Sequence, residues 1–447
     1  MLPLVMLLNA CVPASQSDVP TRANNAGSDL PAMKNFDGSR PAAPERSNRD
    51  LALDFIELSF QLESGRALPV LTRFETPISV RVTGAPPATL GPDLKRLITR
   101  LRNEARIDIN VTNDANANIT VEAVPRDAIR RVLPQAACFV APNVSTLEEY
   151  RKSRRSARTN WTALRTREKI AIFLPNDASP QEVRDCLHEE LAQALGPLND
   201  LYRLPDSVFN DDNVHTVLTG FDMMILRAYY DPALRSGMTR GQVVNALPGI
   251  FARINPVGNL QQSRFATRTP QGWSKSIQTA LGRSISFQSR EKAAKEAIRV
   301  AVAMGWQDHR RAFAHYAMGR VLQSSDPASA HKQYLMADHF YARTPGTSLH
   351  RAYVATQLSA YAISKGEGGE ALRIIQPHVN TAHSNENAAL LSTLLLLRSE
   401  ALEQENRHTE AQSVRLDSIG WARYGFGSDW AVRAKLREIA SLNPLKG

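Results

Sequence analysis

The sequence predicts an α+β domain in its N-terminal half, followed by an all-α region of helical repeats. Strand-type alternation and helix-type periodicity both occur between residues 51 and 238, which is typical of a layered α+β domain. From residue 290 to residue 441 only helix-type periodicity continues. The polar stretch between these parts predicts a linker with short helices. The chain is therefore expected to comprise an N-terminal signal segment (1–11), a flexible tether (12–50), the α+β domain (51–238), the linker (239–289) and the helical repeats (290–447).

The composition excludes several classes of protein. Of the 447 residues, 43% are hydrophobic and 22% are charged, which excludes a wholly disordered chain. Beyond the first few positions no apolar run reaches the roughly 18 residues of a membrane-spanning helix, so a polytopic membrane protein is excluded too. The net charge of +10 leaves nucleic acid or an anionic membrane open as partners. Walker-type and Gly-x-Ser-x-Gly motifs are absent, which lowers the support for nucleotide-dependent chemistry and serine hydrolysis.

The first eleven residues, MLPLVMLLNAC, form an apolar stretch that ends in a cysteine. This ending resembles the lipobox of bacterial lipoproteins, and the resemblance implies that Cys11 is diacylated and becomes the mature N-terminus. Val12 after the cysteine resembles the signal for sorting to the outer membrane. We therefore expect a lipid-anchored protein on the periplasm-facing cell envelope, in the outer membrane rather than the inner one. An ordinary cleaved signal or a chance apolar start is the alternative.

Two further features fit an exported protein. Residues 12–50 are rich in small and polar residues and almost free of large apolar ones, so they predict a flexible tether. Cys138 and Cys186 are the only cysteines besides Cys11, and in an oxidising compartment they are expected to form a disulfide. Two buried free thiols are the alternative.

Periodicity predicts the elements of the α+β domain in order. Alternating apolar and polar residues indicate strands, and apolar residues that recur at three- and four-residue spacing indicate helices. The expected elements are a strand at 55–62, a strand at 76–82, a helix at 92–105, strands at 118–124 and 169–174, and a helix at 180–195.

The helix at 180–195 is the most informative of these elements. Ser179 followed by Pro180 is typical of a helix start, and Gly196 is typical of a helix end. At about 100° per residue, Glu190 falls inside the apolar stripe of this helix. A carboxylate aimed into a buried face needs a partner, because unpaired burial is costly. The partner is either an arginine in a salt bridge or the ligand of a functional site.

The same helix resembles the active helix of the metzincin metallopeptidases. Their pattern is His-Glu-x-x-His-x-x-Gly-x-x-His, in which three histidines hold zinc and the glutamate is the general base. In this chain Glu190 and Gly196 match the pattern in type and spacing. The three ligand positions hold other residues, namely Glu189, Gln193 and Asn199. The resemblance implies a zincin-like fold with Glu190 in the place of the general base.

A later segment strengthens this resemblance. Residues 213–230 resemble the metzincin stretch in which a Met-containing turn leads into a helix, with Leu218 in place of the methionine and Asp222 as the helix cap. Met223 is expected to pack in the core rather than to form the turn. His215 precedes the turn and is the best spare nitrogen ligand.

The domain also resembles a family of uncharacterised proteobacterial lipoproteins. The hallmark Cys-x-x-Glu-Glu-x-x-Gln-x-x-Gly begins here at Cys186. It is followed by Phe-Asn-Asp-Asp at 209–212 and by Asp-Pro-x-Leu-Arg-x-Gly-Met at 231–238. This resemblance covers roughly residues 50–238 and implies a zincin-like fold without an established activity.

These residues leave three functions open. The first is a binding or scaffolding module with a degenerate zincin-like site, since no ligand position holds histidine. The second is a metal-dependent, peptidase-like hydrolase with Glu190 as general base and one divalent metal ion, zinc before manganese or calcium. The third is another hydrolytic mechanism that uses the pair Glu189 and Glu190. The candidate metal ligands are Glu189, Gln193, Asn199 (or Asp200) and His215.

Charge is segregated beside this site. Residues 151–169 hold eight Lys or Arg and one acid, and residues 182–212 hold eight acids and two Arg. We expect the basic run to be a solvated loop at the rim of the site. Binding of anionic lipid, polysaccharide or an acidic peptide is the alternative, and no nucleic acid is expected as a partner.

The C-terminal helices show a repeat. Gly319, Ala360 and Glu400 lie about 41 residues apart, and small residues at such spacing let paired helices approach closely. The segments 316–319 and 338–342 resemble tetratricopeptide repeats. This resemblance implies a stacked helical array that binds a protein or peptide partner.

Overall fold

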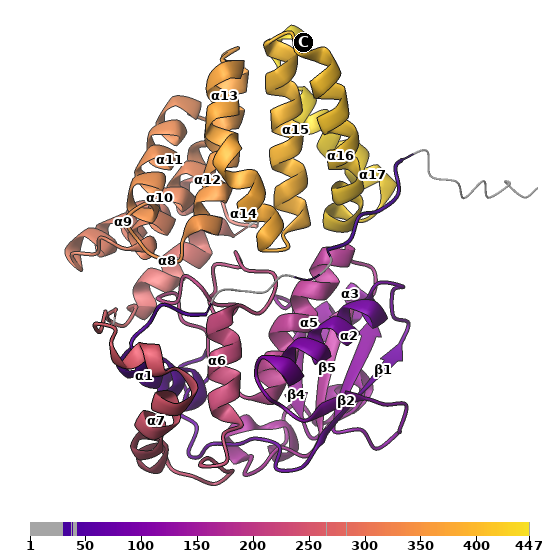
Figure 1. Ribbon diagram of the computed structural model, residues 1–447, viewed down its shortest axis with the longest axis vertical. Helices are drawn as coiled ribbons and strands as arrows, with labels where there is room; N and C mark the ends of the chain where they lie inside the picture. Colours follow the sequence, from indigo (N-terminus) through magenta and orange to yellow (C-terminus); the bar gives the residue numbers. More distant parts are fainter. Residues whose placement is uncertain (1–29, 37, 39–42, 265, 283, 447) are drawn as a thin grey trace, which may run out of the picture.

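The computed structural model describes residues 30–36, 38, 43–264, 266–282 and 284–446. Cys11 and the signal peptide therefore lie outside the described residues. An α/β region forms the lower half of the molecule and an all-helical region the upper half (Figure 1). The predicted fold class, a mixed N-terminal domain followed by an all-α region, is confirmed. No described helix is both long enough and apolar enough to cross a bilayer.

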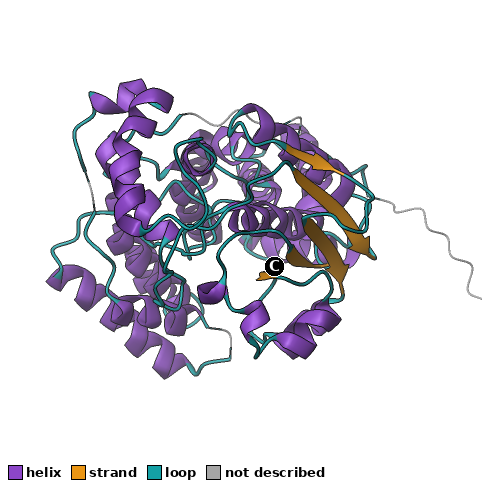
Figure 2. Cartoon of the chain, turned by 90° about the horizontal axis from the view of Figure 1, so that it is seen from below, coloured by secondary structure: helices purple, strands orange, loops and turns teal. Residues whose placement is uncertain are grey.

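A five-stranded sheet forms one side of the α/β region (Figure 2). The strand order is β2-β1-β3-β5-β4. All neighbours pair in parallel except the edge strand β4, which is antiparallel to β5. The strands are β1 (Ile78–Gly84), β2 (Ile109–Val111), β3 (Ile119–Val124), β4 (Phe139–Pro142) and β5 (Ile170–Pro175).

Both faces of the interior strand β5 are buried. Ile172 belongs to the main core beneath α2 (Leu90–Asn103) and α5 (Pro180–Leu195). Phe173, its neighbour on the opposite face, packs in a smaller core with Ile129. A strand buried on both faces reads as a continuous apolar run, which explains why KIAIFL is so clear a signal in the sequence.

The predicted strand at 55–62 is wrong, because helix α1 (Asn48–Ser59) occupies most of that stretch. Ser47 caps the helix by accepting a hydrogen bond from the Asp50 amide at 3.1 Å. Leu51 and Phe55, one turn apart, are both fully buried. The stretch therefore folds by the helical spacing of these two residues and not by the apolar–polar alternation of 55–62. The short elements that the sequence did not predict are β2, β4, α3 (Arg126–Val132) and α4 (Leu147–Ser153).

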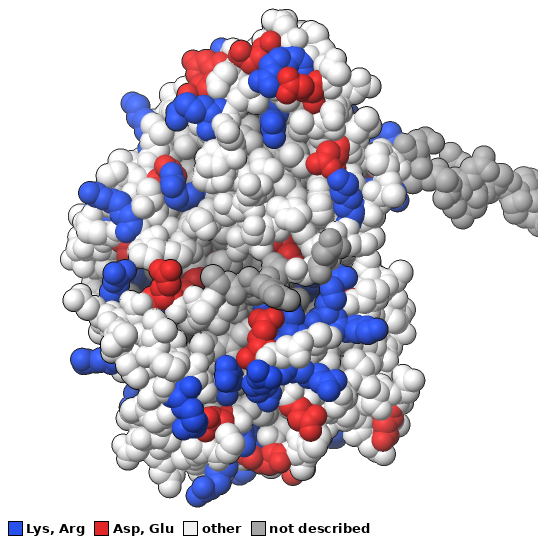
Figure 3. All heavy atoms as spheres, viewed as in Figure 1, with Lys and Arg blue, Asp and Glu red and all other residues white. Residues whose placement is uncertain are grey.

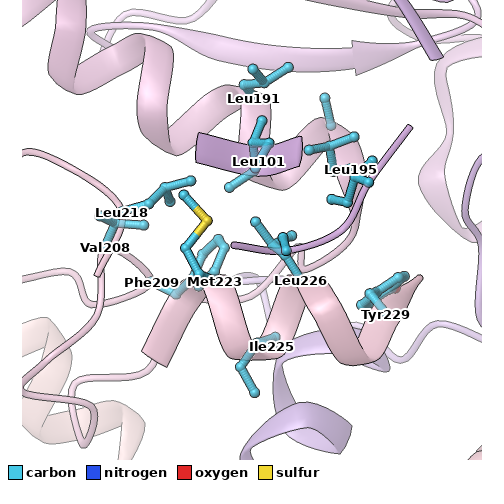
Figure 4. Packing of buried hydrophobic residues seen from close by; sticks show 14 of the residues in the cluster. Leu101, Leu191, Leu195, Val208, Phe209, Leu218, Met223, Ile225, Leu226 and Tyr229 are labelled. Atoms are coloured by element: carbon cyan, nitrogen blue, oxygen red, sulfur yellow. The ribbon is translucent and has the colours of Figure 1, made fainter. Parts of the chain in front are cut away.

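Helix α6 (Gly220–Tyr229) joins α5 in the main core (Figure 4). Met223 of α6 lies in this core with Leu191 of α5, as predicted. The N-cap of α6 is Thr219, and Asp222 three residues later completes the capping box. The predicted cap at Asp222 is therefore shifted by one helical turn. Helix α7 (Arg240–Ile254) follows and packs on α1.

The all-helical region consists of helices that pack in consecutive pairs. A Cβ atom at Gly319 would lie 2.6 Å from the Tyr334 ring, so the repeat glycine permits the close approach of α10 and α11, as predicted. The helices are α8 (Gln271–Leu281), α9 (Phe287–Ala303), α10 (His309–Leu322), α11 (Pro327–Tyr341), α12 (Ser348–Ser364), α13 (Gly368–Ile375), α14 (Val379–Ser384), α15 (Ala388–Gln404), α16 (His408–Phe426) and α17 (Asp429–Ala440).

The two regions are joined at the N-terminal half of α5. Arg184 donates to the Glu386 carboxylate at 3.1 Å, and both side chains are buried. Gln181 donates to the Asn387 side chain at 3.2 Å. Buried polar contacts of this kind fix one relative position of the two regions, because separating them would leave unpaired groups.

The middle of the predicted tether also contacts the helical region. Phe36 is buried and stacks on Trp421 of α16 with ring centroids 4.6 Å apart. Lys34 pairs with Asp417 of the same helix. Lys34 and Phe36, near the middle of the stretch 12–50, thus lie against α16 rather than away from the fold.

The predicted disulfide between Cys138 and Cys186 is present. It ties the start of the edge strand β4 to the middle of α5. Replacing both cysteines by serine is expected to lower the free energy of unfolding by about 4 kcal/mol, since the bond closes a loop of 48 residues. Denaturant titration measures the change. Reducing agent should destabilise the unmodified protein and leave the double variant unchanged; equal effects on both would contradict the prediction.

Candidate functional site

Helix α5 is held at both ends. Ser179 accepts a hydrogen bond from the Glu182 amide at 3.2 Å and caps the N-terminus. At the C-terminus the buried Arg167 donates to the carbonyls of Gln193 at 2.5 Å and Ala194 at 2.7 Å, and to the carbonyl of Gly196. A cation there also complements the negative end of the helix dipole. The side chains of α5 therefore project from a fixed support.

Glu190 of α5 is buried, with 5% of its surface exposed. Its Oε2 atom has no hydrogen-bond partner within the described ranges. Burial raises the pKa of Glu190 well above its usual value, and the nearby carboxylates of Glu189 and Glu63 raise it further. The salt bridge to an arginine that the sequence left open is not among the ion pairs of the described residues.

Glu190 belongs to a group of five carboxylates that we call the acidic cluster. Glu189 and Glu190 come from α5, Asp200 and Asp211 from the loop after α5, and Glu63 from the loop after α1. Their mutual charge effects place them in one electrostatic group. Glu189, Asp200 and Asp211 are half-buried, and Glu63 is exposed. No ion pair joins any of the five to a Lys, Arg or His of the described residues.

The acidic cluster holds protons more tightly than isolated carboxyl groups do. Burial, followed by the charges of Glu63 and Asp211, raises the pKa of Glu189 to about 7. Burial and the charges of its neighbours raise the pKa of Asp200 well above its usual range. The Oδ1 atom of Asp200 also lacks a partner in the described part of the chain. At neutral pH the cluster must therefore retain protons or attract a cation.

A pocket of about 1030 Å³ opens beside the acidic cluster. Glu57 of α1 and three stretches line it: residues 61–65 after α1, residues 199–203 with Asp211 after α5, and residues 268–278 at the start of α8. Glu63, Asp200 and Asp211 of the acidic cluster face this pocket. Three carboxylates without an ion pair in the described residues thus lie next to a space large enough for a small molecule.

The structure brings together only part of the predicted metal-ligand set. Glu189 lies in the acidic cluster, and Gln193 is buried one turn further along α5. The Asn199 side chain donates to the Glu57 carbonyl at 3.0 Å. His215 turns away: its Nε2 lies 2.9 Å from the Pro205 carbonyl. Among the described residues no group of three or more His, Cys, Asp or Glu side chains is arranged to hold a metal ion.

His215 faces the helical region instead. Its ring centroid is 6.0 Å from that of His350 on α12. Burial, and then the neighbouring His350, lower the pKa of His215, while Asp212 opposes them. None of the acidic cluster contributes to this shift, which separates His215 electrostatically from Glu189 and Glu190.

Sequence reasoning missed Glu63, Asp211 and the α8 side of the pocket. The sequence pointed to two of the cluster residues: Asp200 is the alternative third ligand, and Asp211 lies in the Phe-Asn-Asp-Asp motif. Glu63 carried none, because it lies 126 positions before Glu189 in an unremarkable polar stretch.

The basic run at 151–169 is not a uniform solvated loop. Arg167 is buried at the end of α5, and Arg158 donates to the Asn143 carbonyl at 2.8 Å. Arg154 donates to the Val132 carbonyl at 3.0 Å. On the face drawn in Figure 3, basic side chains are spread over the lower half with acidic ones among them. Three arginines of the run therefore form hydrogen bonds to backbone carbonyls of the fold.

Fold and site together define a mixed α/β protein with an acidic pocket, closed on one side by a helical region. Residues 48–249 match the model of a family described as "Protein of unknown function (DUF2927)". This match spans α1 to most of α7 and includes the whole of α5. It agrees with the expected resemblance to an uncharacterised family, and it assigns neither a zincin nor a tetratricopeptide identity. No curated protein and no solved structure matches the chain.

Proposed function

We propose that the protein is a binding protein of the cell envelope whose acidic cluster receives a cationic ligand. The observation that supports this function is the set of five carboxylates, without an ion-pair partner in the described residues, beside a pocket of about 1030 Å³. Natural folds rarely keep such charge unless a ligand or a proton compensates it. The lipobox ending in Cys11 supports an outer-membrane lipid anchor, and the helix pairs support a protein or peptide partner on the helical region.

A cationic probe is expected to stabilise the protein. At pH 8, 1,5-diaminopentane at about 100 times its dissociation constant should add about 2.7 kcal/mol to the free energy of unfolding. A thermal-shift titration measures this as a rise of the midpoint. Asp200→Asn should reduce the rise strongly, because it removes a carboxylate that faces the pocket.

The matched control is Asp108→Asn, which neutralises an exposed carboxylate outside the pocket and should leave the rise intact. A protein whose midpoint responds neither to the diamine nor to calcium ions would overturn the proposed function.

A zinc-dependent mechanism does not fit the residues as they are arranged. His215 is the one nitrogen donor of the predicted set, and it contacts Pro205 and His350 instead of the acidic cluster. The Asn199 side chain is held on α1 by the hydrogen bond that its Nδ2 atom donates to the Glu57 carbonyl. We therefore derive no step that passes through a metal ion.

Hydrolysis by the pair Glu189 and Glu190 is the second candidate. Burial raises the pKa of Glu190 well above its usual value, while the pKa of Glu189 is about 7, and two neighbouring carboxyl groups with raised pKa values suit one general acid and one general base. Glu190→Gln is expected to lower hydrolysis of a peptide library at least about 100-fold while the far-UV spectrum stays that of the folded protein. Unchanged hydrolysis would remove this candidate and leave the binding function standing.

A further inference from the structure

The pocket beside the acidic cluster has two walls that come from different regions of the molecule. Glu63, Asp200 and Asp211 form the α/β wall. Residues 268–278, at the start of α8, form the helical wall. The helical wall lies beyond residue 249, where the family match ends.

The two walls are locked together by packing. Tyr202, two residues after Asp200, has its ring in the core of the helical region, edge-on to Trp273 of α8 at 5.1 Å. His309 of α10 lies 2.7 Å from the Tyr202 carbonyl through its Nε2 atom. Arg310 donates to the Thr267 carbonyl at 2.6 Å and holds the chain that leads into α8. The helical wall is therefore a fixed part of the pocket.

The walls carry opposite charge. On the helical wall Lys275 is exposed and makes no ion pair with any described residue. Arg268, the other cation of this wall, is already engaged by Glu57 at 2.9 Å. Lys275 is thus a cation of the helical wall without an ion pair in the described residues, while Glu63, Asp200 and Asp211 belong to the other wall. The helical wall also offers the side-chain amides and hydroxyl of Gln271, Ser274 and Gln278.

We propose that the ligand is a zwitterion of the amino-acid or peptide class, with an ammonium group at the acidic cluster and a carboxylate at Lys275. This proposal rests on the proposed function, since it takes the acidic cluster to be a cation site. The unpartnered Oδ1 of Asp200, which lines the pocket, marks the ammonium end. A lysine ammonium binds a carboxylate as a charge-assisted donor at the other end. The amides and hydroxyls of the helical wall suit the peptide groups of such a ligand.

Two probes that differ in one group test the assignment. L-lysine carries the two amines of 1,5-diaminopentane plus one carboxylate. Calorimetric titration of the full chain at pH 8 should show L-lysine binding about tenfold more tightly than the diamine, the size of one charge-assisted contact. Lys275→Glu should abolish this preference and leave diamine binding equal or stronger. Lys292→Glu, which changes an exposed lysine of α9 outside the pocket, is the matched control and should keep the preference.

The outcomes separate this inference from the proposed function. Diamine binding that L-lysine does not exceed would overturn the zwitterion and leave the cation site in place. A tenfold preference that survives Lys275→Glu would also overturn the assignment of the carboxylate to Lys275. Binding of neither probe would overturn the cation site itself.

Discussion

Replacing Arg167 by alanine is expected to lower the free energy of unfolding by about 4 kcal/mol. The guanidinium donates to three carbonyls at the C-terminus of α5, and the side chain is 2% exposed. Its loss leaves these carbonyls unpaired in the interior and opens a cavity. Removing a buried charge recovers part of this energy, so the estimate is well below the sum of the separate losses. Denaturant titration at neutral pH measures the change.

Two variants make this prediction specific. Arg165→Ala removes an exposed arginine of the same basic run and should change stability by less than about 0.5 kcal/mol. Arg167→Lys keeps the charge but cannot supply the planar fork of donors. Its free energy of unfolding should therefore lie between that of Arg167→Ala and that of the unmodified protein. If Arg167→Ala behaved like Arg165→Ala, the cap would have no energetic role.

The second large effect is a dependence of stability on pH that Glu189 creates. Its pKa rises from 4.5 in the unfolded chain to about 7 in the folded protein. Between these values the folded protein holds a proton that the unfolded chain has lost, so this contribution is full below pH 4.5 and disappears as the pH rises through about 7. Relative to the unmodified protein, Glu189→Gln should therefore gain about 2 kcal/mol of stability between pH 5 and pH 8, after allowance for the partial exposure of Glu189.

The comparison of two proteins is needed because other groups titrate in the same window. Burial lowers the pKa of His309 to about 4, which acts on stability in the opposite direction as the pH falls. This effect is common to both proteins and cancels in the difference. Denaturation at four pH values in a buffer without amines measures it. Asp108→Asn should show no such gain. If the difference in free energy of unfolding between Glu189→Gln and the unmodified protein did not change with pH, the acidic cluster would already be neutralised in the folded protein.

Local signals were sufficient for the helix that carries the site. Ser179, Pro180 and Gly196 mark the ends of α5, and helical spacing places Glu190 on its buried face. The disulfide could be predicted because Cys138 and Cys186 are the only cysteines besides Cys11. Strand β5 could be predicted from a continuous apolar run, because a strand that is buried on both faces needs apolar residues at successive positions. In each case the structure is determined by neighbours in the chain or by a strong bias of composition.

Long-range packing decided what the sequence did not predict. The stretch at 55–62 satisfies the alternation of a strand, but Leu51 and Phe55 lie on one face of a helix that packs on α7. Glu63 joins the acidic cluster only because α1 brings its loop beside the loop after α5. Lys275 reaches the same pocket because Tyr202 is anchored in the core of the helical region. No local pattern in a single sequence encodes contacts at such separations.

The double anchoring of α5 fixes the spacing between Glu189 and Glu190. Arg184 and Gln181 fasten one end of the helix to the all-helical region, while Arg167 fastens the other end. Asp200 is held as well, because Tyr202, two residues later, is anchored in the core of the helical region. Glu63 differs from these residues, since it lies on an exposed turn. Under the proposed binding function, a change in the length of this turn should alter which molecules the pocket accepts, while the spacing along the helix stays the same.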